Sequence, residues 1–360
     1  MSVQSSKLSL ITHRLYTQRL ISPKFAKVAE VASFFGAVQA QDLLASLWAV
    51  GQRVADATEA TVEQAIEAGT ILRTWPLRGT IHYVTPADVR WLLMLTAERT
   101  IRGAAGRHRQ LGLNEEDFAR SRKALGRALE GGRRLERHAA YATLEAAGVS
   151  TEGQRGIYIL GRLALEGVLC IGPRQGKQPT FVLLDEWVPQ SREMSRDEAL
   201  AELARRYFTS HGPATLADYV WWSGLTLTEA RAGLEAIQGE LVREDLDTET
   251  YWFAPGEQSD FPSPVAHLLP VYDEYAVGYK DRSAILSPEH AARPDAGNGI
   301  FRPPILIDGQ IVGTWTRKVK KGRVAISPNL FRSLTRDEQA AFHAAAERYG
   351  AFLGLAAELD

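Results

Sequence analysis

The same succession of local patterns occurs three times along this 360-residue chain and constrains its fold more than any other feature. In the first copy, residues 24–50 have apolar side chains at the three-to-four spacing of a helix. Thr61 then caps a short helix that ends at Gly69, and residues 71–85 are β-rich with a break at Trp75–Leu77. This order predicts a helix-turn-helix whose last helix leads into a β-hairpin, the winged-helix arrangement.

The second copy begins with a predicted helix over residues 136–149. A helix with an apolar stripe follows over residues 153–167, and residues 168–184 form two β-rich segments around a turn that contains Gly and Pro. The succession is therefore again helix, helix, strand, strand. It predicts a second winged-helix module.

The third copy begins at Arg205. Pro213–Thr215 caps one helix, Thr226 or Thr228 caps the next, and residues 241–255 supply two strands. The spacing between the copies is irregular, whereas a solenoid requires a fixed period. We therefore expect three tandem modules rather than a repeat array.

The pattern changes over residues 264–330, which are β-rich and punctuated by Gly and Pro. Asn298-Gly299 and Asp308-Gly309 are hairpin-turn dipeptides, and Asp337–Ala357 reads as a closing helix. We expect an α+β fold in which a small β-barrel-like domain is built onto the third module. The predicted segments are residues 1–100 with the first module, 101–190 with the second, 191–262 with the third, and 263–360 with the β-rich domain and closing helix.

Charge and composition exclude several classes of protein. Lys and Arg number 42 and Asp and Glu 43, so the net charge of −1 gives no overall attraction to nucleic acid or anionic lipid. Basic residues nevertheless cluster in Arg102–Arg109, Arg122–Arg137 and Arg317–Arg323. The single Cys170 excludes intramolecular disulfides. No apolar stretch approaches the ~20 residues of a membrane span, and the N-terminus lacks a secretory signal, so we expect a soluble cytoplasmic protein.

Common catalytic and cofactor motifs are absent from the sequence. The eight His residues show no metal-binding spacing, and there is no nucleophile elbow. Gly172–Lys177 is one residue too short for a phosphate-binding loop and lacks its Ser or Thr. Gly297-Asn298-Gly299 has no third Gly and no following helix. We therefore expect neither a metal nor an organic cofactor.

Five motifs, in the same order along nearly the whole chain, resemble the AlkZ/YcaQ-type winged-helix DNA glycosylases. They are VQAQDL (Val38–Leu43), RTWPLRGTIHYV (Arg73–Val84), LLPVYDEYAVGYKDRS (Leu268–Ser283), GNGIFRPPILIDG (Gly297–Gly309) and GTWTRK (Gly313–Lys318). The resemblance implies a C-shaped set of tandem winged helices with a β-domain. It also implies excision of bulky N-alkylated purines, interstrand crosslinks included, from duplex DNA.

The catalytic signature that the resemblance implies is two Gln residues separated by an apolar residue. The matching triplet is Gln39-Ala40-Gln41, which indicates the AlkZ-like branch. The resemblance also implies a hairpin that probes the lesion, which we assign to the basic segment 316–323.

Two neutral amides are an unusual choice for hydrolysing an N-glycosidic bond. Breaking this bond builds positive charge on the sugar, and enzymes usually meet that charge with a carboxylate. A Gln cannot ionise, but two amide oxygens can orient a water and direct dipoles at the developing cation. That suffices when the base is already cationic and leaves as a neutral molecule. The sequence therefore predicts a monofunctional glycosylase for cationic alkylpurines, with no lysine nucleophile.

The spacing of the Gln pair raises a geometric condition. Residues i and i+2 of a helix lie about 200° apart, so Gln39 and Gln41 can share a face only if this segment is extended or distorted. Gly36 permits such a distortion. Asp42 is either the functional carboxylate or a helix cap, and the cap is the more ordinary role.

Other polar and aromatic residues are candidates for secondary roles. Asp273 and Glu274 lie beside aromatic residues and are either polar groups of the cleft or, as we prefer, structural hydrogen-bonding groups. Trp75 either stacks on DNA bases or, more ordinarily, packs in the core. The full set of candidate DNA-binding residues is Arg73, Trp75, Arg78, His82, Arg107, Arg109, Lys280, Arg282, Arg317, Lys318, Lys320, Lys321 and Arg323.

Two alternatives to an enzyme remain open. A non-catalytic DNA-binding regulator would read base edges with a recognition helix, for which helix 154–166 offers Gln154, Arg155 and Arg162. A protein that sequesters a toxin or small molecule is a third reading. A regulator is usually a symmetric dimer, whereas three unequal modules in one chain favour a monomer acting on duplex DNA that carries alkylated purines.

Overall fold

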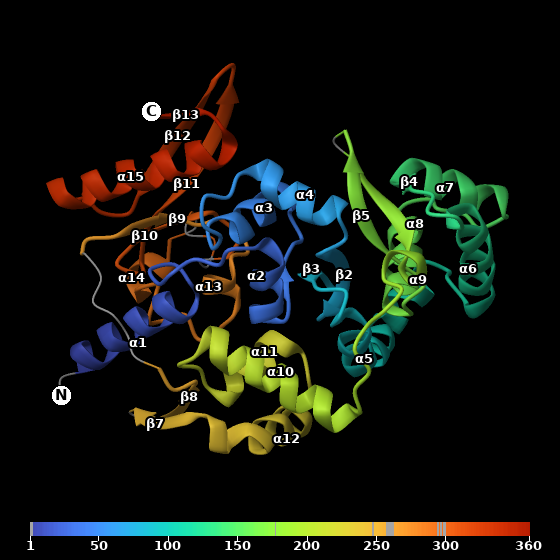
Figure 1. Ribbon diagram of the computed structural model, residues 1–360, viewed down its shortest axis with the longest axis horizontal. Coiled ribbons are helices and arrows are strands. Elements are labelled where there is room, and N and C mark those ends of the chain that lie inside the picture. The colour runs from blue at the N-terminus through green and yellow to red at the C-terminus, as the bar shows by residue number, and fades with distance from the viewer. Residues whose placement is uncertain are drawn as a thin grey trace. The chain divides into compact units, whose positions relative to one another are not determined.

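The chain forms two compact units in a computed structural model (Figure 1). Unit 1 combines Met1–Val62 with Ala201–Asp360, and unit 2 is Glu63–Leu200. Both mix helices and strands, which confirms the α+β class. The structure describes residues 3–176, 178–246, 248–256, 263–293, 295, 297 and 300–360. The Asn298-Gly299 turn lies outside these ranges, and no helix within them is long and apolar enough to cross a membrane.

Unit 2 is built on strands in the order β3-β2-β5-β6-β4, with helices beside them (Figure 1). Its core contains Trp75, Phe118, Leu144, Leu160 and Phe181, all at most 8% exposed. The elements are β2 (Leu72–Leu77), β3 (Thr80–Val84), α5 (Val89–Gln110), α6 (Glu115–Leu129), β4 (Leu135–Glu136), α7 (Arg137–Ala146), α8 (Arg155–Leu165), β5 (Leu169–Gln175), β6 (Gln178–Leu183) and α9 (Leu184–Trp187); α4 (Glu59–Glu67) and α10 (Arg196–His211) cross the unit boundaries.

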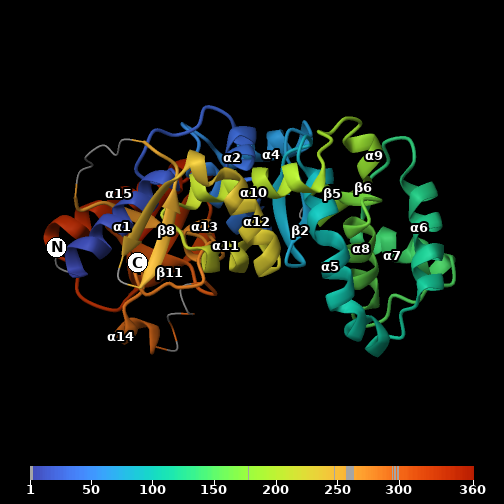
Figure 2. The same ribbon diagram turned by 90° about the horizontal axis from the view of Figure 1, so that it is seen from below.

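Unit 1 contains a helical part and a sheet, and α11 and α12 lie beside α10 in both views (Figure 1, Figure 2). Its helices are α1 (Val3–Thr17), α2 (Val28–Phe35), α3 (Leu43–Gly51), α11 (Leu216–Ser223), α12 (Leu227–Ile237), the 3-10 helix η1 (Gln238–Glu240), α13 (Glu274–Val277), α14 (Pro288–Ala291) and α15 (Arg336–Leu353). Its strands are β1 (Val38–Gln39), β7 (Val242–Leu246), β8 (Glu249–Phe253), β9 (Ala266–Leu268), β10 (Pro304–Ile307), β11 (Gln310–Lys320), β12 (Arg323–Leu330) and β13 (Ala356–Leu359).

The C-terminal sheet is a curled half-barrel rather than a closed barrel. Its order is β13-β12-β11-β10-β9, so β13 and β9 are edge strands. The long helix α15 contacts both of them. The expected closing helix Asp337–Ala357 ends earlier, because Gly354 adopts a left-handed cap at φ 66° and the chain continues as β13. β13 pairs in parallel with β12.

The helix expected over residues 24–50 is wrong as a single element. Gly36 ends α2 with φ 78°, the chain runs extended through β1, and α3 starts after Asp42. The apolar spacing continues through the break because Val38 and Ala40 are buried in the core as well. Periodicity alone therefore does not reveal where a buried helix gives way to extended chain.

Helix caps were predicted well where a hydroxyl precedes an acidic residue by three positions. Thr215 caps α11, and of the two alternatives Thr226 caps α12 by accepting the Glu229 N–H. The helix expected after Thr61 begins earlier, at Glu59. There the Thr58 N–H donates to the Thr61 hydroxyl at 3.2 Å, so Thr58 precedes the first turn.

A fully buried ion pair ties α3 to the start of α13. Arg53 follows α3 and donates from both terminal nitrogens to Asp273, at 2.8 and 2.9 Å. The same guanidinium also donates to the Gln18 and Ala49 carbonyl oxygens. Asp273 in turn accepts the Tyr275 N–H at 3.0 Å and so caps α13. Because both charges are buried, each depends on the other for its solvation.

We expect Arg53→Met to lower the free energy of unfolding by about 3–5 kcal/mol, because it leaves the Asp273 carboxylate buried without its counter-charge. Urea unfolding followed by circular dichroism measures this. The matched control is Arg243→Met, whose ion pair with Asp245 has side chains 58% and 61% exposed. That control changes stability by less than about 1 kcal/mol, and equal effects of the two substitutions would contradict the role of the buried pair.

Candidate active site

The segment between α2 and α3 is not helical, and this decides what Gln39 and Gln41 can do. Gln39 lies in β1, and the N-cap Asp42 still has extended backbone angles, φ −95° and ψ 117°. The Asp42 carboxylate accepts the Ala45 N–H at 2.9 Å and thereby starts α3. An extended segment frees residues i and i+2 from the opposed directions that a helix would impose. The geometric condition set by the sequence is therefore met.

The two Gln residues differ in their surroundings. The Gln39 side chain is buried, 8% exposed, and its Oε1 accepts the backbone N–H of Gln41 at 2.7 Å. The side chain thus folds along the chain toward Gln41. Gln41 itself is exposed to solvent. The arrangement brings the Gln39 amide and the backbone of the exposed Gln41 within hydrogen-bonding distance.

Glu274 forms a buried hydrogen bond with the Gln39 backbone. Its Oε1 accepts the Gln39 N–H at 2.6 Å, across 235 residues of sequence. Its Oε2 accepts the Trp222 indole N–H at 2.9 Å and lies 3.2 Å from His211 Nε2. Glu274 is 1% exposed. A carboxylate with three such contacts is held firmly, and a charge-assisted hydrogen bond of this kind fixes the strand position of Gln39.

His211 completes this buried network as a neutral ring. Burial lowers the pKa of His211, and the Glu274 carboxylate opposes that effect only in part. The tautomer protonated on Nε2 donates to Glu274 and leaves Nδ1, 2.8 Å from the Ser210 hydroxyl, to accept. His211 and the Gln39 backbone are thus linked through the single carboxyl group of Glu274.

The three acidic candidates thus have different partners in the structure. Asp273 pairs with Arg53 and caps α13, Glu274 holds the Gln39 backbone, and Asp42 is exposed and caps α3. The structural role preferred for Asp273 and Glu274 agrees with these contacts. Sequence reasoning did not single out Arg53 or His211, which carry no local motif. The signal for Glu274 was present, since an acidic pair between aromatic residues is unusual.

A small pocket of about 140 Å³ adjoins the start of α3, lined by Asp42, Leu44, Thr316 and Arg317 among others. Arg317 comes from β11, and its guanidinium lies over the Tyr349 ring, 5.5 Å from the centroid. Burial lowers the pKa of Arg317, and the carboxylates of Glu59 and Asp42 partly offset this. The pocket brings β11, at the root of the β11–β12 hairpin, next to Asp42. Asp42 ends the segment 38–42 that carries Gln39 and Gln41, which we call the Gln segment.

The β11–β12 hairpin carries the basic segment predicted to probe DNA, and its tip projects at the top of Figure 1. Val319 is an apolar side chain left 59% exposed near the tip. Arg323 is ion-paired with Glu358 at 2.7 Å. The remaining basic residues of the hairpin are Lys318 and Lys321, which are exposed, and Lys320, which is half-buried.

Three candidate DNA-binding residues in unit 2 are buried. Trp75 is 8% exposed and packs in the core of unit 2, and Arg73 and His82 are 4% and 0% exposed. A buried side chain cannot reach a phosphate without a rearrangement, so DNA contact by these three residues would require their side chains to move outward. Arg78 is half-buried at the turn between β2 and β3, with φ 53°.

The other basic DNA-binding candidates differ in their exposure and in their contacts. Arg107 and Arg109 are exposed at the end of α5, where Arg107 donates to Gln154 at 2.8 Å. Lys280 is exposed. Arg282 donates to the Tyr279 carbonyl oxygen at 3.0 Å, and burial lowers its pKa.

The recognition-helix alternative receives little support from α8. Arg155 donates to Asp117 at 3.3 Å and to the Leu111 carbonyl oxygen at 2.5 Å. Arg162 pairs with Glu166 at 2.6 Å and with Glu115 at 3.2 Å. Both guanidinium groups are thus committed within unit 2. Within the described residues, no group of three His, Cys, Asp or Glu side chains is arranged to hold a metal ion.

Comparison with known proteins places this arrangement in a family. The family model "DNA glycosylase AlkZ-like" matches residues 33–352. The chain belongs to the AlkZ-like DNA glycosylase family. The protein is therefore a DNA glycosylase, an enzyme that hydrolyses N-glycosyl bonds.

Two individual proteins illustrate the similarity. An "Interstrand DNA cross-link repair glycosylase" of Streptomyces sahachiroi is 25% identical over 295 residues, covering 75% of this chain and 78% of that protein. The solved structure of Streptomyces sahachiroi DNA glycosylase AlkZ superposes with a TM-score of 0.79 at 21% identity. That superposition covers 98% of this chain and 99% of the other. The fold of the whole described chain is thus that of AlkZ.

Replacing Glu274 by Gln tests whether this carboxylate positions the Gln segment. The side-chain amide nitrogen of a Gln cannot accept, so at least one of the donors from Gln39, Trp222 and His211 loses its acceptor. We expect the excision rate to fall about tenfold or more, because small misplacements of reacting groups are costly. DNA affinity, measured separately by fluorescence anisotropy, stays the same.

The control is Trp222→Phe, which removes one donor from Glu274 but keeps the aromatic packing. It reduces the excision rate less than Glu274→Gln does. Both variants are compared at a temperature where circular dichroism shows them folded. An unchanged single-turnover rate in folded Glu274→Gln would rule out the positioning role.

Proposed function

We propose that Gln39 and Gln41 form the catalytic pair of a monofunctional DNA glycosylase that releases cationic N-alkylated purines. The observation that carries the proposal is the non-helical segment that joins the Gln39 amide to the Gln41 backbone at 2.7 Å. In this arrangement Gln41, the exposed residue, meets the damaged nucleotide. Gln39 fixes the segment and adds its remaining amide lone pair and N–H groups.

The chemistry requires little from the protein when the base is already charged. An N7- or N3-alkylated purine departs as a neutral molecule, so no general acid is needed. Amide oxygens can orient the attacking water and face the positive charge that develops on the sugar. Glu274 accepts the Gln39 N–H at 2.6 Å and so fixes the position from which these amides act.

DNA binding is proposed to involve the β11–β12 hairpin. Lys318, Lys320 and Lys321 offer charges for phosphates, and Arg317 lies at the root of the hairpin beside the Gln segment. Val319 is an exposed apolar side chain of the kind that can press between base steps. The hairpin is thus suited to contact the duplex close to the damaged nucleotide.

Winged-helix modules remain our proposal for the helical parts of the chain. Unit 2 contains the succession α6–β4–α7–α8–β5–β6, in which two helices lead into a hairpin that β4 extends. The successions α2–α3–α4–β2–β3 and α10–α11–α12–β7–β8 follow the same plan. We propose that these modules, with the segment boundaries predicted from sequence, bind duplex DNA and that the protein acts as a monomer.

The natural substrate is proposed to include bulky adducts and crosslinked purines. The support is the name of the Streptomyces sahachiroi relative, an interstrand cross-link repair glycosylase. The exposed position of Gln41 agrees with this, because an exposed residue can reach a bond without drawing a large adduct into a closed pocket. A non-catalytic DNA-binding protein is the alternative that the following variants exclude or support.

The double variant Gln39→Ala/Gln41→Ala should lose excision by a factor of about 100 or more, as when designed electrostatic contacts to a transition state are removed. Its DNA affinity should stay within about threefold. Base release from 7-methylguanine DNA measures the first quantity, and fluorescence anisotropy measures the second.

Asp42→Asn is the matched control for that variant, because Asn still caps α3 but carries no charge. It should retain most of the activity. If Asp42→Asn abolishes excision while the double Gln variant remains active, Asp42 is the catalytic group and the proposed pair is wrong.

Substrate selectivity follows from the neutral pair. The enzyme should release 7-methylguanine, whose base leaves without protonation, and should release no uracil, whose departure needs stabilisation of an anion. Product analysis by liquid chromatography of both duplexes under the same single-turnover conditions decides this. Comparable rates on the two duplexes would show that a stronger catalyst than an amide pair is present.

A further inference from the structure

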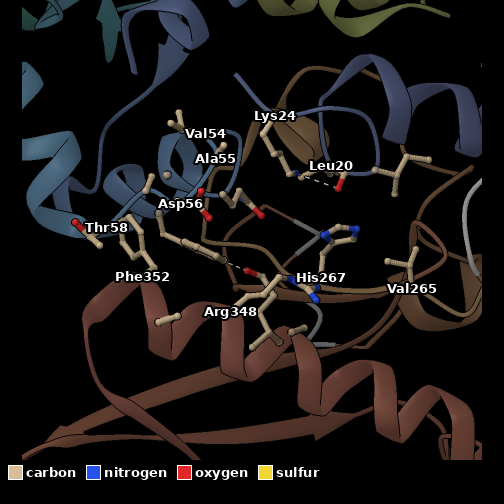
Figure 3. A pocket seen from close by; sticks show the side chains of 18 residues that line it. Leu20, Lys24, Val54, Ala55, Asp56, Thr58, Val265, His267, Arg348 and Phe352 are labelled. Carbon is tan, nitrogen blue, oxygen red and sulfur yellow. Dashed lines mark hydrogen bonds between the residues drawn. The ribbon is translucent and has the colours of Figure 1, made fainter. Parts of the chain in front are cut away.

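A second, larger pocket lies in unit 1, apart from the Gln segment. Its volume is about 760 Å³, within the range of small-molecule sites. Lys24, His267 and Arg348 are its basic lining residues. Figure 3 shows Lys24 entering from one wall, and His267 and Arg348 from the opposite one. The indole of Trp48 lines both this pocket and the small pocket at the start of α3.

The Lys24 amine and the Arg348 guanidinium have no carboxylate partner within the described part of the chain. The Lys24 amine donates to the backbone carbonyl oxygens of Arg19 and Leu20, at 2.6 and 3.1 Å. Arg348 donates to the Ala266 carbonyl oxygen at 2.6 Å. Carbonyl oxygens satisfy the hydrogen bonds of these groups but leave their charges uncompensated. Asp56 also lines the pocket, but it forms an ion pair with neither cation.

Neighbouring charges make this concentration of positive charge unfavourable in the empty pocket. Burial and the guanidinium groups of Arg53, Arg348 and Arg19 lower the pKa of Lys24, against the opposing effect of Asp273. The buried Arg53–Asp273 pair is neutral overall, so it does not offset the two cations.

His267 supplies an independent sign of a missing partner. The residue is 7% exposed, and its Nε2 is buried without a hydrogen-bond partner among the described residues. Burial, with Lys24, Arg348 and Arg53 adding to it, lowers the pKa of His267 well below its ordinary value. The ring is therefore neutral and can offer one N–H. Buried polar atoms in folded proteins nearly always have a partner.

The remaining walls are apolar. Trp48, Phe352, Leu20 and Leu268 line the pocket together with aliphatic residues. A site that combines large apolar walls with a few convergent polar groups suits a ligand with a hydrophobic body and a small polar head. An inorganic ion would satisfy the charges but leave most of this volume unfilled.

We propose that this pocket binds a compact organic anion whose acidic group meets Lys24, Arg348 and His267 and whose apolar body packs against Trp48 and Phe352. The acidic group is a carboxylate, sulfonate or phosphate, all of which accept hydrogen bonds from these three donors.

Two fluorescent probes that differ in one group test the proposal. Anilinonaphthalene sulfonate carries an aromatic body and an acid, and N-phenyl-1-naphthylamine has the same ring system without the acid. The full-length protein should bind one sulfonate molecule at saturation, and the uncharged probe should bind about tenfold more weakly or worse. The comparison isolates the contribution of the acidic group.

Substitutions then locate the site. Lys24→Met and Arg348→Met should each weaken the sulfonate probe about tenfold, as expected for loss of one charge-assisted contact. Neither should weaken the uncharged probe. Lys24→Arg should restore affinity. The control Lys123→Met removes an exposed lysine of α6 and leaves both affinities unchanged.

Each outcome decides the proposal. Because Arg348 also anchors Ala266, thermal unfolding checks that its variant is folded, and Lys24→Met gives a test that does not depend on that contact. The proposal is overturned if the two probes bind the wild-type protein equally well. It is overturned equally if Lys24→Met leaves the affinity for the sulfonate unchanged. These measurements use no DNA, so their result is separate from the glycosylase mechanism.

Discussion

The buried acidic dipeptide Asp273-Glu274 holds the rest of unit 1 in place. Asp273 binds the guanidinium of Arg53, just after α3, and Glu274 binds the backbone of Gln39, just before it. One short stretch of chain thus fixes both ends of the segment that carries the Gln pair. An ionised carboxylate only accepts hydrogen bonds, so two adjacent carboxylates can bind several donors. The cost of burying them is offset only because every donor is in place.

Local signals in the sequence were enough to predict many helices and strands. They were not enough to predict where a buried helix ends and buried extended chain begins. The caps at Thr215 and Thr226 follow from chemistry within four residues; the sequence predicted Thr215 and offered Thr226 as one of two alternatives. The break between α2 and α3 was not predicted, because the helix and the strand there are both apolar. The apolar spacing of residues 24–50 therefore predicted one continuous helix. Gly36 was the sole local hint. Only tertiary contacts decide such a boundary.

The residues of the candidate site also fall into two groups, those that a local motif predicts and those that only the tertiary structure reveals. Gln39 and Gln41 were identified because a short motif carries them, whereas their support comes from residues more than 170 positions away, such as His211 and Glu274. The candidates Arg73, Trp75 and His82 were chosen for their chemistry, and the structure buries all three. Residue type indicates what a side chain can do. Its exposure depends on the packing of distant segments, which no local pattern encodes.

The network behind Gln39 shows how the proposed neutral pair is held in position. Glu274 accepts hydrogen bonds from a strand N–H and an indole N–H and contacts a buried imidazole, so distant elements meet at one carboxyl group. Accurate placement is what two neutral amides need, because they can only orient a water and direct dipoles at the charge that develops on the sugar. A carboxyl group inside the protein fixes the strand peptide that ends at the proposed pair and leaves the exposed position to Gln41.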